Sequence, residues 1–277
     1  SASKAGSPQH YLRRLVLDPA EFQELVEDLV VPETWFFRDV LAFRAVARFL
    51  DARRGSNRPL VRVLSVGCST GEEVYSLAIA LREAGVAPPR FLILGTDLSR
   101  KSLELAREGT FAPKSFREPG EQAGALRERW FERDGDSWRV REELRAGVQW
   151  RCANLAEPEF LTGEPPFHVV FCRNVLIYFH AEARQMAVRH LHRLLSRDGV
   201  LCATPAEARI FNAAGFASLG SECPLAFRRR DATAAESPAP AIADSPTTLA
   251  GQVCKLSRAG PNAGAPDVRS FDGPGDL

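Results

Sequence analysis

The sequence predicts an α/β fold in which a mostly parallel sheet is covered by helices on both faces. Two observations lead to this prediction. From residue 59 onward, short runs of apolar and β-branched residues alternate with segments that carry a helical pattern. Connections of helical length join parallel strands, whereas antiparallel neighbours need only short turns.

The first part of the chain is helical. Apolar residues recur at helical spacing over residues 11–31, and a longer helix is expected from about Val40 to Arg53, ending before Gly55. The chain does not begin with methionine, which is expected of a segment excised from a longer protein. Residues 1–31 are therefore assigned to a short N-terminal helical segment, and residues 32–230 to the α/β domain.

The α/β domain contains strands and helices in alternation. The expected strands are Leu60–Val66, Phe91–Thr96, Phe167–Cys172 and Val200–Ala203. Three helices are expected between them: one ends at about Glu83, one runs from the capping Ser99 to Gly109, and one spans Glu182–Leu195. Helices of this length between strands are typical of βαβ units.

Residues 127–155 interrupt this alternation. The runs Trp130–Arg133 and Trp138–Arg141 flank Asp-Gly-Asp-Ser, which predicts a β-hairpin. We expect Val148–Cys152 to extend it into a three-stranded antiparallel unit, so that residues 127–152 form an inserted β-subdomain. Residues 231–277 are rich in Ala, Pro, Gly, Ser and Asp, which predicts a disordered tail or linker, after which a further domain could follow.

Composition excludes some classes of function. Lys and Arg total 36 and Asp and Glu total 35, so no basic nucleic-acid surface is expected. No apolar run approaches the roughly 20 residues that span a bilayer, and no signal peptide is visible, so we expect a cytoplasmic protein. A monomer is expected, although no sequence feature indicates the oligomeric state. The six cysteines form no CxxC pair and are interpreted as reduced, buried thiols. His190 and His192 are interpreted as surface residues, and no metal site is expected.

The strongest local signal follows the first strand. Gly67 and Gly71 bracket a loop of small residues between this strand and a helix, and glycine lets a ligand approach the backbone closely. Asp97 ends the next strand, where an acid can accept hydrogen bonds from both ribose hydroxyls. The alternative for Asp97 is to cap the following helix, a role that Ser99 serves as well.

NAD fits these two elements as well as S-adenosylmethionine does. However, the loop lacks the close G-x-G-x-x-G spacing that binds a pyrophosphate, and Glu72 and Glu73 at the helix start would repel one. A cofactor with a positive sulfonium and no phosphate fits better, which favours S-adenosylmethionine.

Five segments in order resemble one family. They are TxFFR (34–38), STGEExYS (69–76), TDLS (96–99), ANL (153–155) and FCRNVLIYF (171–179), and together they are similar to the chemotaxis-receptor methyltransferase (CheR) family over about residues 11–230. The resemblance implies a class I methyltransferase domain, Rossmann-like, with a mostly parallel seven-stranded sheet and an inserted three-stranded β-subdomain. It also implies that residues 1–31 are the remnant of an N-terminal helical domain.

The resemblance further implies a function. Members transfer methyl from S-adenosylmethionine to receptor glutamates, which yields methyl esters and S-adenosylhomocysteine. The implied partner is the cytoplasmic signalling domain of a methyl-accepting chemoreceptor, and a receptor tail peptide could add a strand to the β-subdomain. That subdomain could instead merely cover the sheet edge.

Cofactor contacts are implied at matching positions. They are Thr34, Arg38, Gly67, Glu72, Asp97 as the ribose-binding acid, Asn154 and Leu155 beside the adenine, and Arg173 and Asn174 at the end of the fourth strand. Pro32 departs from the family, which often has Asn there, so one cofactor hydrogen bond is missing or replaced.

Two residues are expected to be catalytic. A glutamate carboxylate is already ionised at neutral pH, since its ordinary pKa is about 4.3, so no general base is needed. Arg38 is expected to hold the substrate or cofactor carboxylate, and Tyr178 to donate a hydrogen bond to the attacking oxygen. The alternatives are a salt bridge of Arg38 with Glu33 or Asp39, and packing of Tyr178 beside Phe179.

Two other functions remain open at this point. One is a regulatory module that binds S-adenosylmethionine or its demethylated product and transfers nothing. The other is a methyltransferase for RNA or a small molecule, against which the neutral charge and the Arg173-Asn174 strand end count.

Overall fold

The structure, a computed structural model, describes residues 7–53, 60–117, 121–221 and 223–230. The predicted tail at 231–277 lies outside these residues. The helices are α1 (Pro8–Leu17), α2 (Pro19–Leu29), α3 (Val40–Asp51), α4 (Glu72–Glu83), α5 (Arg100–Glu108), α6 (Glu121–Trp130), α7 (Glu142–Arg145), α8 (Ala181–Leu194) and α9 (Pro205–Ala213), with short 3-10 helices η2 (Pro113–Ser115) and η3 (Leu176–Tyr178).

The strands form two sheets. They are β1 (Val61–Val66), β2 (Phe91–Asp97), β3 (Thr110–Phe111), β4 (Phe131–Asp134), β5 (Ser137–Val140), β6 (Val148–Cys152), β7 (Phe167–Cys172), β8 (Leu195–Cys202), β9 (Phe216–Ser218) and β10 (Ala226–Arg229). Seven of the described strands make the main sheet, in the order β6-β2-β1-β7-β8-β10-β9, with β6 to β8 parallel and β10 antiparallel to both neighbours. The predicted mostly parallel sheet is confirmed.

Each face of the main sheet carries its own apolar cluster. On one face, Phe43 of α3 and Leu77 of α4 pack with Val63 of β1, and all three side chains are buried. On the other face, Leu191 of α8 packs with Leu64 of β1. Alternate residues of β1 therefore point to opposite faces, and helices cover both, as a parallel sheet requires.

The small sheet differs from the prediction. Its order is β3-β5-β4, so Thr110–Phe111 supplies the third strand of the β-subdomain. Val148–Cys152 instead pairs in parallel with β2, and the prediction that this run extends the hairpin is wrong. The reason is packing: Gly95 of β2 has no side chain, and a Cβ there would lie 2.7 Å from the ring of Trp150. The indole fills that space and meets Tyr75 edge to face at 5.6 Å.

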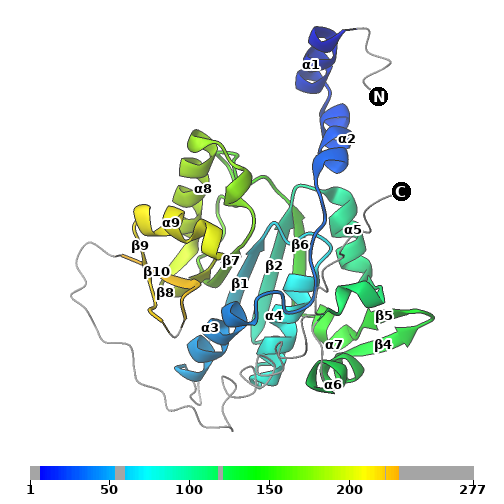
Figure 1. The fold of residues 1–277 in the computed structure, drawn as a ribbon, viewed down its shortest axis with the longest axis vertical. Coiled ribbons are helices and arrows are strands. Elements are labelled where there is room, and N and C mark those ends of the chain that lie inside the picture. The colour runs from blue at the N-terminus through cyan, green and yellow to red at the C-terminus, as the bar shows by residue number, and fades with distance from the viewer. Residues whose placement is uncertain (1–6, 54–59, 118–120, 222, 231–277) are drawn as a thin grey trace, which may run out of the picture.

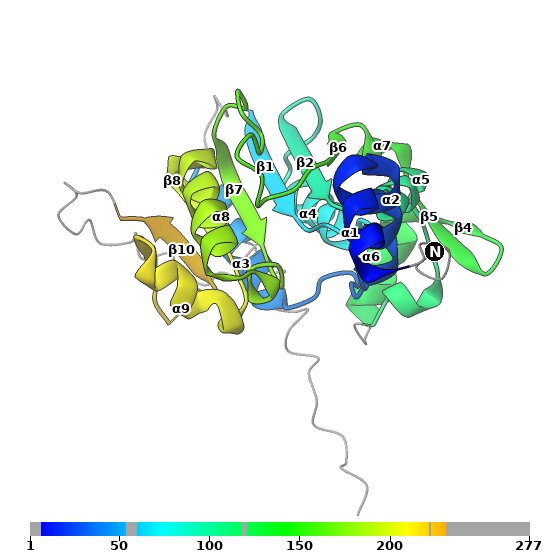
Figure 2. The ribbon, with the colours of Figure 1, turned by 90° about the horizontal axis from the view of Figure 1, so that it is seen from above.

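The N-terminal helices extend away from the sheet, and the small sheet lies at the end of the molecule opposite α8 and α9 (Figures 1 and 2). Helix α2 is attached through polar contacts to the start of α5. The Glu27 carboxylate accepts hydrogen bonds from the Ser99 hydroxyl and from the Arg100 backbone N–H at 2.8 Å, and Gln23 donates to the Leu98 carbonyl at 3.0 Å. An acid at a helix N-terminus satisfies donors that the helix itself leaves free.

Two expectations about single residues are corrected. His190 is buried rather than at the surface, because its face of α8 packs under Phe160, and burial lowers its pKa. Cys68, Cys172 and Cys202 are buried as expected, but Cys152 is exposed at the end of the edge strand β6. Within the described ranges, the helices are all too short or too polar to cross a bilayer.

His168 of β7 makes the stability depend on pH. Its Nδ1 accepts a hydrogen bond from the backbone N–H of Arg62 at 3.0 Å, and burial together with the Arg53 and Arg62 cations lowers its pKa from 6.5. A protonated ring cannot accept that bond, whereas the unfolded chain takes up a proton near pH 6.5. This contribution to the unfolding free energy is therefore complete above pH 6.5 and is lost as the pH falls below it.

The amide oxygen of an asparagine at position 168 can accept the same bond at any pH in this range. We therefore predict that the unfolding free energy of His168→Asn falls less than that of the wild type when the pH is lowered from about 7 to about 5. Urea unfolding at several pH values measures this. His10→Asn, a change of an exposed histidine on α1, should follow the wild type. Parallel pH profiles for His168→Asn and the wild type would contradict the role of His168.

Candidate active site

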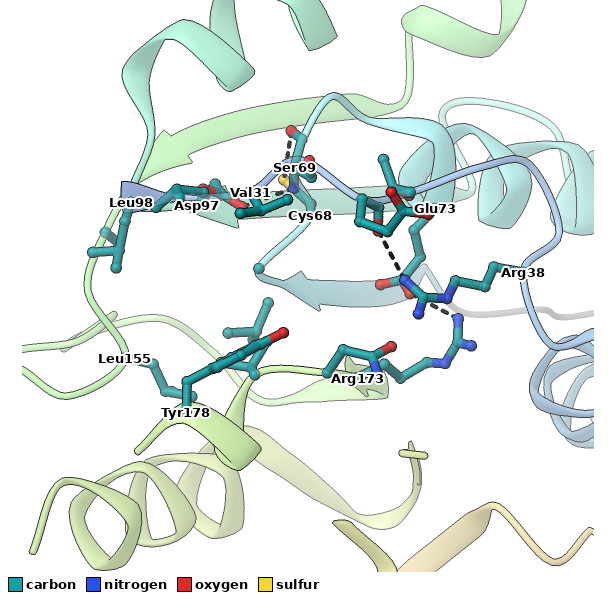
Figure 3. Close-up of a pocket in the computed structure, with 18 of the residues that line it drawn as sticks. Val31, Arg38, Cys68, Ser69, Glu73, Asp97, Leu98, Leu155, Arg173 and Tyr178 are labelled. Atoms are coloured by element: carbon teal, nitrogen blue, oxygen red, sulfur yellow. Dashed lines mark hydrogen bonds and ion pairs between the residues drawn. The ribbon is translucent and has the colours of Figure 1, made fainter. Parts of the chain in front are cut away.

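A pocket of about 460 Å³ lies at the carboxyl ends of β1, β2 and β7 (Figure 3). In the strand order, β1 stands between β2 and β7, which is the position where a doubly wound sheet binds ligands. The predicted site residues that line the pocket are Thr34, Arg38, Gly67, Asp97, Asn154, Leu155, Arg173, Asn174 and Tyr178. Segments far apart in the sequence therefore meet in one cavity.

Gly67 begins the loop between β1 and α4. Its φ is +68°, and a Cβ built there would lie 2.5 Å from Cγ2 of Val175. Its N–H donates to the Thr96 carbonyl at 2.8 Å, which ties the loop to the end of β2. Only glycine fits here without moving Val175, because both the conformation and the space exclude a side chain.

Asp97 lies at the end of β2 with its carboxylate fixed by backbone donors. One oxygen accepts from the Ser69 N–H at 2.7 Å and the other from the Ser99 N–H at 2.9 Å. Burial raises the pKa of Asp97, and these hydrogen bonds partly offset the rise. The N-cap of α5 is Ser99, which accepts from the Ser102 N–H at 2.9 Å. Asp97 thus orders the loop and retains acceptor capacity toward the pocket.

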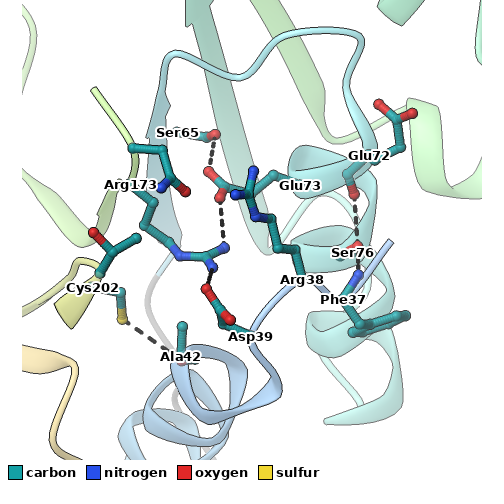
Figure 4. Close-up of polar contacts among 12 residues, drawn as sticks. Phe37, Arg38, Asp39, Ala42, Ser65, Glu72, Glu73, Ser76, Arg173 and Cys202 are labelled. Carbon is teal, nitrogen blue, oxygen red and sulfur yellow. Dashed lines mark hydrogen bonds and ion pairs between the residues drawn. The ribbon is translucent and has the colours of Figure 1, made fainter. Parts of the chain in front are cut away.

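Arg173 follows β7 and is the centre of an ion-pair network (Figure 4). Its side chain is 2% exposed and pairs with Glu73 of α4 at 3.0 Å and with Asp39, just before α3. Ser65 donates to Glu73 at 2.7 Å. Burial raises the pKa of Glu73, and the Arg173 cation opposes that rise. The guanidinium thereby joins the end of β7 to the starts of α3 and α4.

Glu72 does not lie where the sequence analysis expected it. It is absent from the pocket lining, and its carboxylate accepts from Thr70 at 2.6 Å and from Ser115 at 2.8 Å. The lining acid is its neighbour Glu73. Successive residues in a helix are about 100° apart, so only one of the two can face the pocket, and the angle at which α4 leaves Gly71 selects Glu73.

Arg38 and Tyr178 reach the pocket from opposite sides. Arg38 donates to the Glu33 carbonyl at 2.8 Å and lies over the ring of Trp35 at 4.4 Å. Asp39, the other partner considered, pairs with Arg173. Tyr178 is 80% exposed, so its ring is not packed into the core. Both side chains are available to a ligand at the pocket.

A buried carboxylate shapes the wall after β7. Glu207 of α9 is fully buried and accepts from the backbone N–H groups of Asn174, Val175 and Leu176 at 2.9 to 3.1 Å, and from both the N–H and the hydroxyl of Thr204. These bonds hold Asn174 at a φ of +59°. The position of this wall therefore depends on α9.

Sequence reasoning missed three features of the site. They are the segment Leu29–Val31 at the end of α2, which lines the pocket, Glu73, and Glu207. A signal existed for Glu207, because Thr204 and Glu207 form a capping box at the start of α9. No sequence signal marks Leu29–Val31, since their place over the pocket depends on how α2 docks onto α5.

The residues present fit S-adenosylmethionine. The volume lies in the range of small-molecule sites, an acid capable of binding ribose stands at the end of β2, and Leu98 and Leu155 give an apolar wall. Glu73 and Asp97 provide negative charge for a cationic ligand. A pyrophosphate fits poorly, because the first two residues of α4, Glu72 and Glu73, are acidic.

Residues 32–219 match the family described as CheR methyltransferase, SAM binding domain. The chain belongs to the CheR methyltransferase family. The resemblance carried by the five sequence motifs is confirmed, and S-adenosylmethionine is the cofactor of this domain. The class I methyltransferase fold agrees with the mostly parallel sheet and the small antiparallel sheet beside it.

Relatives of this CheR domain carry two kinds of name. The chain is 40% identical to the "Probable biofilm formation methyltransferase WspC" of Pseudomonas aeruginosa over 79% of its own length and 52% of the relative. It is 35% identical to the "Chemotaxis protein methyltransferase" of Salmonella typhimurium, over 68% of this chain and 64% of that protein. It is 34% identical to the protein of the same name from Escherichia coli, over 72% of this chain and 69% of that protein. The chain spans about half the length of the biofilm relative.

Glu207→Ala tests how the wall after β7 is held. The change leaves buried backbone donors without an acceptor, so we expect a loss of about 3 kcal/mol of unfolding free energy and weaker binding of S-adenosylhomocysteine. Chemical unfolding and calorimetry measure the two effects. Glu104→Ala, an exposed acid on α5, is the matched control and should change neither. A Glu207→Ala variant as stable as this control would refute the role of Glu207.

Gly67→Ala tests the close approach at the loop. Gly135 in the hairpin is the matched control: its φ is also positive, +59°, but nothing lies within 4 Å of a Cβ there. We expect Gly135→Ala to cost about 1 kcal/mol with cofactor affinity unchanged. Gly67→Ala should cost more and weaken S-adenosylhomocysteine binding in calorimetry. Equal affinities in the two variants would show that the loop can move aside.

Proposed function

We propose that this chain transfers a methyl group from S-adenosylmethionine to glutamate side chains of a methyl-accepting chemoreceptor. The observation that carries the proposal is the presence of Arg38 and Tyr178 in the same pocket as the cofactor-binding acid Asp97. The names of the chemotaxis relatives support the receptor as substrate.

The chemistry needs alignment rather than a base. Bound S-adenosylmethionine supplies an electrophilic methyl group on a positively charged sulfur. A glutamate carboxylate is ionised near neutral pH, so it needs no proton acceptor before it reacts. What the protein must do is hold the carboxylate oxygen in line with the methyl and keep water away from it.

Arg38 and Tyr178 supply that alignment in our proposal. The guanidinium of Arg38 can donate two hydrogen bonds to one carboxylate, and its stacking on Trp35 limits its freedom. The hydroxyl of Tyr178 can donate one more from the opposite side. Val30 and Leu155 line the pocket with apolar surface, which lowers the local dielectric and strengthens these bonds.

The pocket lining supports a set of cofactor contacts. We propose that Asp97 holds the ribose, that Asn154 and Leu155 flank the adenine, and that Gly67, Thr34 and Asn174 contact the remainder. Glu73 takes the role that the motif suggested for Glu72, because it is the one of these two acids that lines the pocket. Its negative charge suits the cationic end of the cofactor.

The partner in this proposal is the cytoplasmic signalling domain of the receptor. The 40% identity to a relative named for biofilm formation makes receptors that govern biofilm formation the first to test. A receptor tail peptide could add a strand to β4, because β4 is an edge strand of the small sheet and its residues 132–134 are exposed.

We predict that Arg38→Ala lowers the transfer rate about 100-fold and Tyr178→Phe about tenfold. The reaction uses labelled S-adenosylmethionine with receptor signalling domains, and base-labile methyl esters are counted and mapped to glutamates. Arg90→Ala, which changes an exposed arginine before β2, is the control and should react like the wild type.

The same experiment distinguishes methyl transfer from the competing function. Tight cofactor binding in calorimetry with no methyl ester on any receptor domain would favour a regulatory module that binds and does not transfer. Wild-type rates in both Arg38→Ala and Tyr178→Phe would show that neither side chain aligns the substrate.

A further inference from the structure

Arg38 lies in the middle of an unusual turn. Its two neighbours, Phe37 and Asp39, both have positive φ, at 55° and 58°. Residues with a Cβ rarely adopt this conformation, and an aromatic residue does so at a cost, so surrounding contacts must hold the turn. The direction in which Arg38 leaves the backbone depends on those contacts.

One side of the turn is fixed by α4. The Phe37 N–H donates to the Ser76 hydroxyl at 2.9 Å, and that hydroxyl donates in turn to the Glu72 carbonyl at 2.6 Å. The Phe37 ring packs edge to face on Phe43 at 5.3 Å. These contacts fix the residue before Arg38 and leave the residue after it to be held separately.

The other side is fixed by Asp39. This residue is the N-cap of α3, where an aspartate normally accepts a hydrogen bond from the first turn of its own helix. Here its carboxylate makes no such capping bond and pairs with Arg173 instead (Figure 4). Because Arg173 is also paired with Glu73, its guanidinium is a fixed point to which Asp39 is anchored.

We propose that Asp39 is a positioning residue that directs Arg38 into the pocket by anchoring the turn to Arg173. Asp39 is absent from the pocket lining and is 44% exposed, so it acts through Arg38 rather than on the ligand. For methyl transfer this inference rests on the proposed function, whereas for ligand binding it rests on the geometry of the turn alone.

A double-mutant cycle between Asp39 and Arg38 tests this. We measure kcat and KM for methyl transfer, and the dissociation constant of S-adenosylhomocysteine, in the wild type, Asp39→Asn, Arg38→Ala and the double variant. Asp39→Asn should lower kcat about tenfold by misplacing Arg38. In the Arg38→Ala background the same change should alter kcat by less than about twofold, because no guanidinium remains to be directed.

Two further variants separate positioning from stability. Glu143→Gln in α7 is the matched control: that carboxylate is similarly exposed, at 51%, and pairs with Arg82, but it lies outside the pocket lining. Even if its melting temperature changes as much as that of Asp39→Asn, the kcat of this control should equal that of the wild type. Asp39→Glu, which keeps the charge for Arg173, should recover most of the lost rate.

Equal losses of kcat from Asp39→Asn in both backgrounds, or no loss in either, would overturn the inference. If the wild type itself forms no ester, the proposed function fails and the dissociation constants decide. Coupling of the two substitutions in the affinity for S-adenosylhomocysteine would then uphold the role of Asp39. Additive effects or no effect on that affinity would overturn it.

Discussion

The side chain of Arg173 brings a positive charge into the interior at the end of β7, and two carboxylates from separate segments neutralise it. Removing such a charge from water costs several kcal/mol unless partners with good geometry surround it. Glu73 and Asp39 are those partners, at the starts of α4 and α3. The strand, the cofactor loop and the turn that carries Arg38 are thereby restricted to one mutual arrangement.

Glu207 applies the same principle on the neighbouring side of β7. Its carboxylate collects the N–H groups of the segment after the strand, which would otherwise be buried without acceptors. The pocket is thus shaped by backbone held in place from behind, and the side chains that face the ligand are few. Such a wall can be rigid although it is made of loops, because each loop is fixed by a buried charge.

Much of the fold was predictable because its signals are local. The apolar runs, the glycines after them and the acid at the end of β2 lie within short stretches of sequence, and the alternation of strand and helix allowed few arrangements. The fate of Val148–Cys152 was not predictable in this way. A strand has the same two-residue period in either sheet, and the space beside Gly95, which Trp150 fills, favours the main sheet.

The sequence by itself determined the family, the cofactor class and most of the residues that meet at the pocket, because motif residues at strand ends carry the chemistry directly. Only the tertiary structure decided which of Glu72 and Glu73 faces the pocket, since helix phase depends on how α4 docks. It also decided the partners of Arg173, because ion pairs between segments far apart depend on distances that no local pattern encodes.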